Sequence, residues 1–185
     1  APAPIDPAKA SAALTDPAAA NETAPETFRI RFSSTQGDFE ADCVRQWAPK
    51  AADRLYNLVR IGYYADMPFW RVVHESPDFV RFGIHGTPEV TQAWKHKTLP
   101  NEPPQGLNTR GTISFARTIT GDTASTELII NLAANSAFDD EKLTPVCLIA
   151  ESALGPLEKL YSAYGDEPAA KQTRFEELGN KFAKE

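Results

Sequence analysis

The sequence has little of several things, and each shortage excludes a class of protein. Only two cysteines and three histidines occur in 185 residues, which is too few for a disulfide-rich scaffold. The histidines are scattered, and neither cysteine has His or Asp neighbours at the spacing of metal ligands. We therefore predict no metal ion and no cofactor. No apolar run approaches the length of about 20 residues that a membrane-spanning helix needs, so we predict no membrane span.

Positive charge is also scarce. The chain carries 19 Lys and Arg against 25 Asp and Glu, a net charge of -6, and has no basic cluster, which argues against a nucleic-acid partner. At 20.3 kDa and 42% hydrophobic residues, the chain can bury one full core. The simplest arrangement is a single folded domain, which we expect to be a monomer.

The N-terminal region differs in composition from the rest. Residues 1–26 are rich in Pro and Ala and almost lack large apolar side chains, so we predict a flexible tether there and a folded domain at 27–185. The chain begins Ala-Pro-Ala-Pro and its one methionine is Met67, as when an export signal has been cut after a small residue. This predicts a periplasmic or secreted protein. A cytoplasmic one stays open, because recombinant chains can begin the same way.

The two cysteines, Cys43 and Cys147, leave two alternatives open. In an exported protein they could pair, whereas in the cytosol they would be buried thiols. Alternation along the chain places Cys43 on an inward face with Phe39 and Ala41, which favours the buried thiol.

Hydrophobic periodicity indicates a strand-rich domain. Alternation predicts a hairpin over 28–43, a second hairpin formed by 69–73 and 78–84, and strands near 111–116, 127–131 and 145–150. Helical spacing predicts one helix from Pro49 to Gly62 and another over 154–161, while residues 86–110 indicate a long excursion with one short helix. Many strands with two helices favour a closed barrel plugged at its ends.

Arg71 is the most unusual residue of the second hairpin. It lies among aromatic residues on a strand that should be half buried, and an arginine cannot shed its charge. It therefore needs an acceptor from the protein or from a ligand. The plain alternative is a surface arginine at a strand edge, as most arginines are exposed.

Three ordered motifs resemble the cyclophilin-type peptidyl-prolyl isomerases, over roughly residues 28–162: Phe69-Trp70-Arg71-Val72-Val73, Phe79-Val80-Arg81-Phe82-Gly83 and Arg110-Gly111-Thr112-Ile113-Ser114-Phe115-Ala116-Arg117. The resemblance implies a mainly β fold, a closed antiparallel barrel of about eight strands capped by two α-helices. One part departs from the family. Residues 166–185 are rich in helix formers where the family has its last strand, so that strand is either missing or replaced.

The resemblance also implies the site. Arg71 matches the family's catalytic arginine, which donates a hydrogen bond to the prolyl nitrogen. Residues expected to contact the substrate are Phe69, Phe79, Arg81, Ala116, Arg117, Glu127, Ile129, Phe138 and Leu143. Of these, four form the proline pocket: Phe79, Ile129, Phe138 and Leu143. The backbone of Ala116 and Arg117 would pair with the peptide, and Ala137 in place of a tryptophan implies weak cyclosporin binding.

Two of these positions depart from the family in charge. Arg81 and Glu127 stand where the family has glutamines, so two amides have become opposite charges on elements that should face each other. We expect Glu127 to pair with Arg81 or with Arg71. The alternative is two unrelated solvated charges.

These observations favour a peptidyl-prolyl isomerase that acts on flexible or unfolded proline-containing segments and assists folding. A catalytically weak module that binds such segments is the alternative, favoured by the substituted glutamines. A barrel that holds a small ligand inside is disfavoured, because its apolar side chains suffice to fill a small barrel.

Overall fold

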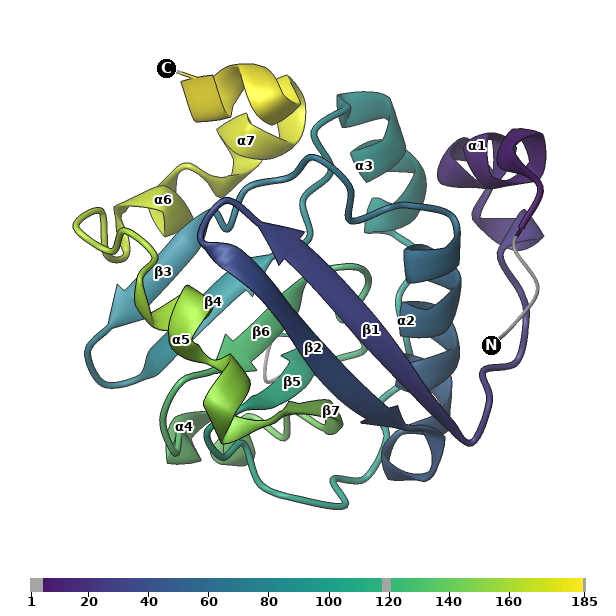
Figure 1. Cartoon of the computed structure of the whole chain (residues 1–185). Coiled ribbons are helices and arrows are strands. Elements are labelled where there is room, and N and C mark those ends of the chain that lie inside the picture. The colour runs from purple at the N-terminus through teal and green to yellow at the C-terminus, as the bar shows by residue number, and fades with distance from the viewer. Residues whose placement is uncertain (1–4, 118–120, 185) are drawn as a thin grey trace.

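The structure is a computed structural model that describes residues 5–117 and 121–184 (Figure 1). Seven antiparallel strands form one sheet, in the order β1-β2-β7-β5-β6-β4-β3. Their bounds are β1 Thr27–Ser34, β2 Gly37–Val44, β3 Arg71–His74, β4 Asp78–Phe82, β5 Thr112–Phe115, β6 Leu128–Asn131 and β7 Pro145–Ile149. The predicted mainly β fold is confirmed. A closed barrel is not, because β1 and β3 end the order and hydrogen bonds do not close the sheet within the described residues.

The helices lie around the sheet. They are α1 Pro7–Thr15, α2 Pro49–Arg60, α3 Pro88–Lys95, α4 Ser136–Asp140, α5 Gly155–Glu158, α6 Glu167–Ala170 and α7 Gln172–Leu178. The predicted helix from Pro49 is α2, which buries Leu55 and Leu58 against the sheet. The second predicted helix is shorter than expected, since only the single turn α5 forms there. Among the helices of the described residues, none has both the length and the apolar character needed to cross a bilayer.

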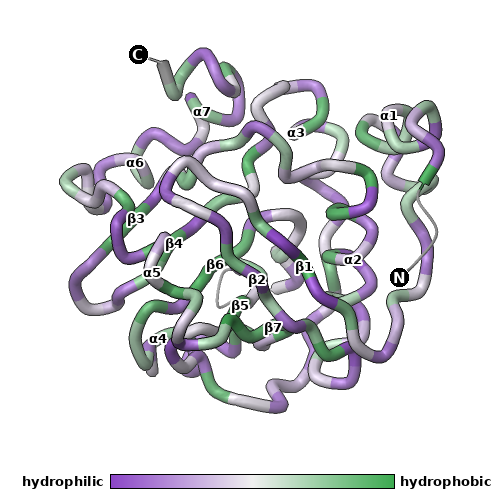
Figure 2. The backbone as a smooth tube through the Cα atoms, viewed as in Figure 1, coloured by the Kyte–Doolittle hydropathy of each residue, from purple (hydrophilic) through white to green (hydrophobic). Residues whose placement is uncertain are grey.

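Alternation along the central strands separates two apolar clusters. On β6, Leu128 and Ile130 enter the main core, whereas Ile129 belongs to a second cluster with Phe79 of β4. Successive strand residues point to opposite faces of a sheet, so one strand serves both clusters. Figure 2 shows the resulting hydrophobic stretches along the central strands β5 and β6. The face that carries the second cluster is called the outer face below.

Cys43 and Cys147 form a disulfide, so the favoured interpretation as buried thiols is wrong. The two residues lie directly opposite each other in the register of β2 and β7. Both are buried, as the alternation predicted for Cys43. Alternation reveals which face a residue occupies but not which strand lies beside it, and therefore could not decide the pairing.

The N-terminal arm, residues 5–26 of the predicted tether, lies against the domain in this structure. Residues 1–4 of that prediction lie outside the described residues. Asp6 caps α1 by accepting hydrogen bonds from the backbone N–H groups of Ala8 and Lys9. The α1 helix packs against α3, and the Trp94 indole donates to the Leu14 carbonyl at 2.9 Å. The small side chains that weaken this segment as an independent unit allow it to approach the domain closely.

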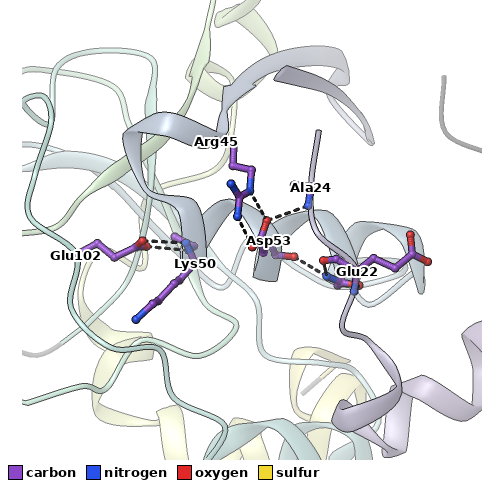
Figure 3. Close-up of polar contacts among 8 residues, drawn as sticks. Glu22, Ala24, Arg45, Lys50, Asp53 and Glu102 are labelled. Atoms are coloured by element: carbon purple, nitrogen blue, oxygen red, sulfur yellow. Dashed lines mark hydrogen bonds and ion pairs between the residues drawn. The ribbon is translucent and has the colours of Figure 1, made fainter. Parts of the chain in front are cut away.

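Further polar contacts fasten the arm to α2 (Figure 3). The N–H of Ala24 donates to Asp53 at 2.8 Å, and Asp53 also accepts from Arg45. Asn57 both accepts from the N–H of Glu22 and donates to its carbonyl. These contacts satisfy backbone groups that an unanchored segment would leave to water.

The C-terminal segment passes beside β3 (Figure 1). We call residues 159–171 the strap. Leu157 of α5 before it and Phe175 of α7 after it are each 1% exposed, and Phe175 packs with Trp70 and Ile84. The helix formers of this region do form helices, namely α6 and α7. The strap is therefore anchored at both ends.

Candidate active site

The β3–β4 hairpin places two arginines side by side on the outer face. Arg71 of β3 lies opposite Arg81 of β4 in the antiparallel register. The guanidinium carbon of Arg71 lies 4.8 Å from the centre of the Phe79 ring, over its face. Such a cation–π contact is favourable and holds the charge at the edge of the apolar cluster. Arg71 is thus a partly enclosed cationic donor beside an apolar surface.

The apolar surface gathers five predicted substrate-contacting residues from different parts of the chain. Phe79, Ala116, Ile129, Phe138 and Leu143 form one cluster, with Val73 packed against it. The rings of Phe79 and Phe138 meet edge to face at 5.3 Å. Because β4, β6 and α4 each contribute, the cluster depends on the tertiary fold. Its side chains can contact a proline ring next to the donor.

A buried polar network supports this cluster from below. The Asn108 side chain donates to the Leu143 carbonyl and to Asp139 of α4, each at 2.9 Å, and accepts from Ser114 at 2.8 Å. Asn135 donates to the carbonyl of Asp78, next to Phe79. Buried polar groups that are satisfied in this way rigidify their surroundings. The residues that flank the cluster are thereby fixed.

Glu127 pairs with Arg81 rather than with Arg71, at 2.8 Å between Oε2 and Nε. This decides between the two partners that the sequence allowed. The Arg81 guanidinium also lies over the Trp70 ring, 5.1 Å from its centre. Burial raises the pKa of Glu127 above its ordinary value, while the charge of Arg81 and its hydrogen bond act in the opposite direction.

Arg71 has a partner that the sequence did not reveal. Asp166 of the strap accepts from Nε of Arg71 at 2.9 Å and lies 2.7 Å from Nη2. Gln172 of α7 similarly reaches Glu127, at 3.0 Å. Both residues come from the region that departs from the family pattern, where no motif could assign them a role.

The remaining predicted residues lie outside the apolar cluster. Phe69 packs on Phe82 of the main core, with ring centres 5.3 Å apart, so the structure does not bring it to the cluster. Arg117 follows Ala116 after β5, and its side chain donates to the Lys142 carbonyl. Arg117 and Ala116 also border a cavity of about 350 Å³ whose lining includes Arg81 and Glu127.

The part of the chain that the structure describes was predicted to carry no cluster of metal ligands. Within residues 5–117 and 121–184, no group of three or more His, Cys, Asp or Glu side chains is arranged to hold a metal ion. The arrangement instead offers hydrogen-bond donation and charge stabilisation beside an apolar cluster.

The chain belongs to the cyclophilin family. The sequence model described as "Cyclophilin type peptidyl-prolyl cis-trans isomerase/CLD" matches residues 27–152, which confirms the resemblance seen in the motifs. Peptidyl-prolyl cis-trans isomerase A of Dickeya dadantii (strain 3937) is 32% identical over 111 residues, covering 60% of this chain and 57% of that protein. Peptidyl-prolyl cis-trans isomerase B of Escherichia coli (strain K12) is 29% identical over 127 residues, covering 66% and 76%. The chain thus spans less than two thirds of the Dickeya protein.

Solved structures support the fold. A cyclophilin type peptidyl-prolyl cis-trans isomerase of Cryptosporidium parvum superposes with a TM-score of 0.60 at 16% identity, covering 74% of this chain and 86% of that one. A cyclophilin of Hirschia baltica gives a TM-score of 0.55 at 14% identity, covering 78% and 71%. At these identities the likeness concerns the fold alone.

Proposed function

We propose that this protein is a peptidyl-prolyl cis-trans isomerase acting on X-Pro bonds of flexible or unfolded segments, and that it thereby assists folding. The observation that carries the proposal is the position of Arg71, a cationic donor held over Phe79 at the edge of the apolar cluster. Membership of the cyclophilin family supports it.

The chemistry needs a hydrogen-bond donor and an apolar surface for the proline ring, which Arg71 and the apolar cluster provide. Rotation about an X-Pro bond is slow because amide resonance creates a barrier of about 18–20 kcal/mol. A hydrogen bond from Arg71 to the prolyl nitrogen draws the lone pair out of resonance and favours the twisted transition state. The apolar cluster holds the proline ring while the preceding carbonyl rotates. Each lowering of the barrier by about 1.36 kcal/mol gives a tenfold faster reaction.

A binding module with weak catalysis is the second candidate, and a specific observation favours it. Both outer-face arginines have carboxylate partners, Glu127 for Arg81 and Asp166 for Arg71. A donor that is already engaged has fewer N–H groups for the prolyl nitrogen. Such a protein would hold proline segments without accelerating their rotation.

Replacement of the donor separates the two candidates. We expect Arg71→Ala to lower kcat/KM for a short X-Pro peptide by about a hundredfold or more, as loss of a transition-state donor does. The measurement is cis-to-trans relaxation, with peptide affinity followed by NMR titration. Arg31→Ala is the control, since Arg31 of β1 pairs with Asp38 of β2 and neither residue belongs to the apolar cluster. No acceleration by the unchanged protein across several X residues, together with measurable peptide binding, would establish the binding module instead.

The cellular location and the finer properties of the protein are also proposals. The disulfide supports a periplasmic or secreted location, because disulfides persist in oxidising compartments. Thiol titration of the denatured, unreduced protein should find no free thiol; titratable thiols would count against this location.

The proposal also includes a monomeric state, which sedimentation would test, and weak inhibition by cyclosporin. A closed barrel would need a further strand between β1 and β3, and hydrogen exchange at these two edges would detect it.

A further inference from the structure

Arg71 is held from two sides. The Phe79 ring lies under its guanidinium, and one oxygen of Asp166, Oδ1, is within hydrogen-bonding distance of both Nε and Nη2. A guanidinium carries five N–H groups in a fixed plane. The contacts at Nε and Nη2 occupy one edge of the planar guanidinium. The Nη1 end therefore points away from Asp166. The pair therefore sets the orientation of the donor while leaving one end of it for another acceptor.

Arg71 requires such a partner because of its neighbour. Arg81 lies directly opposite it in the hairpin, and like charges at opposed positions repel each other. Glu127, 2.8 Å from Arg81, offsets part of the Arg81 charge, so the repulsion between the two arginines is reduced but not removed. Without Asp166, Arg71 would keep the repulsion from Arg81 and the contact with Phe79. Those two interactions leave the guanidinium free to swing toward solvent.

The strap fixes Asp166 where it can meet Arg71. A turn closed by the N–H of Gly165 donating to the Ser162 carbonyl at 2.9 Å precedes Asp166. Gly165 itself adopts a positive φ of 49°, which glycine tolerates best. Asp166 then stands at the N-terminal cap position of α6. Together with the anchors at Leu157 and Phe175, the turn holds a carboxylate beside the outer face.

We infer that Asp166 is a positioning residue of the isomerase, which holds the Arg71 guanidinium in the orientation that donates to the substrate. The inference rests on the proposed function of Arg71. It assigns to the strap a part in the reaction, although the strap lies outside the residues that match the family.

The test compares Asp166→Ala with Asp166→Glu. The control is Glu167→Gln, which removes one negative charge from the adjacent strap residue, whose carboxylate pairs with Lys171. We expect Asp166→Ala to lower kcat/KM by up to about fivefold, the range of a solvent-exposed ion pair. Peptide affinity should change by less than twofold, because Asp166 orients the donor and does not bind the ring. Asp166→Glu should restore part of the loss, and Glu167→Gln should behave as the unchanged protein.

A second readout is independent of catalysis. The Nε–H signal of Arg71 in ¹⁵N NMR should be ordered in the unchanged protein and motionally averaged in Asp166→Ala. Loss of order without any catalysis in either protein would refute the proposed isomerase and leave Asp166 as the residue that orders Arg71. Unchanged order, or an unchanged or raised kcat/KM in Asp166→Ala, would overturn the inference. A raised value would show that the carboxylate competes with the substrate.

Discussion

Two ion pairs lie side by side on the outer face, and they differ most in the exposure of their carboxylates. The arginines are almost equally enclosed, with 20% of the Arg81 side chain and 21% of the Arg71 side chain exposed. Their carboxylate partners are not equally enclosed. The Glu127 side chain is 17% exposed, whereas the Asp166 side chain is 70% exposed. One pair joins residues of the central sheet region, and the other joins a strand to the strap.

This difference separates a structural contact from an adjustable one. A largely enclosed charge that loses its partner recovers its hydration poorly, so the Arg81–Glu127 pair, with side chains 20% and 17% exposed, should be costly to break. The Asp166 side chain is mostly exposed and already hydrated, so water screens its attraction to Arg71 and the Arg71–Asp166 pair should be cheap to break. A donor that must be oriented and still attract a substrate acceptor is better served by the second kind of partner, because an exposed carboxylate offsets less of its charge.

The largest expected effect comes from breaking the more enclosed pair, Arg81–Glu127. Glu127→Ala leaves Arg81 without its carboxylate and should lower the free energy of unfolding by about 3 kcal/mol. Urea denaturation measures this directly. A loss below about 1 kcal/mol, the value of a surface pair, would show that Arg81 finds water or another partner.

The double variant Arg81→Gln/Glu127→Gln is the matched control for that prediction. It replaces both charges by amides, the residue type that the resemblance implies at these positions in the family. Replacing both members of a buried pair is often close to neutral, so we expect a change of at most about 1 kcal/mol. Comparison with Arg81→Gln alone and Glu127→Gln alone gives the coupling free energy between the two residues.

A smaller effect should appear in the pH dependence of stability. The pKa of Glu127 is raised in the folded state by burial, so the folded protein binds this proton more tightly than the unfolded chain does. The contribution of Glu127 is therefore fully present below the unfolded value of about 4.3 and is lost as the pH rises through the folded pKa. Glu127→Gln should lack this decline. The unfolding free energy of the unchanged protein minus that of Glu127→Gln should therefore fall as the pH is raised from 4. A constant or rising difference would contradict the prediction.

Much of the fold could be predicted because it depends on local periodicity. Alternation located the strands, and helical spacing with Pro49 located α2. The contacts of the arm with Asp53 and Asn57 could not be predicted, because they are made through its backbone and leave no hydrophobic pattern in the sequence. The disulfide likewise depends on which strand lies beside β2.

The site could be predicted where motifs cover it. Phe79, Ile129 and Phe138 meet in one cluster as the resemblance implied, since alternation carries the first two to the outer face. Phe69 lies on the main core, because its position before β3 directs it to Phe82. The role of Asp166 could not be predicted from the sequence. This residue lies 95 residues from Arg71, and only the folded strap brings the two together.

The smallest expected effect comes from breaking the exposed pair. Asp166→Asn keeps the shape and an acceptor oxygen but removes the charge, and should lower the free energy of unfolding by less than about 1 kcal/mol. Salt should reduce even this difference, because exposed charges are screened over about 10 Å at 0.1 M. Urea denaturation at low and high ionic strength measures both quantities. A loss of unfolding free energy comparable to that of Glu127→Ala would mean that the strap depends on this one contact. Both pairs would then be structural contacts.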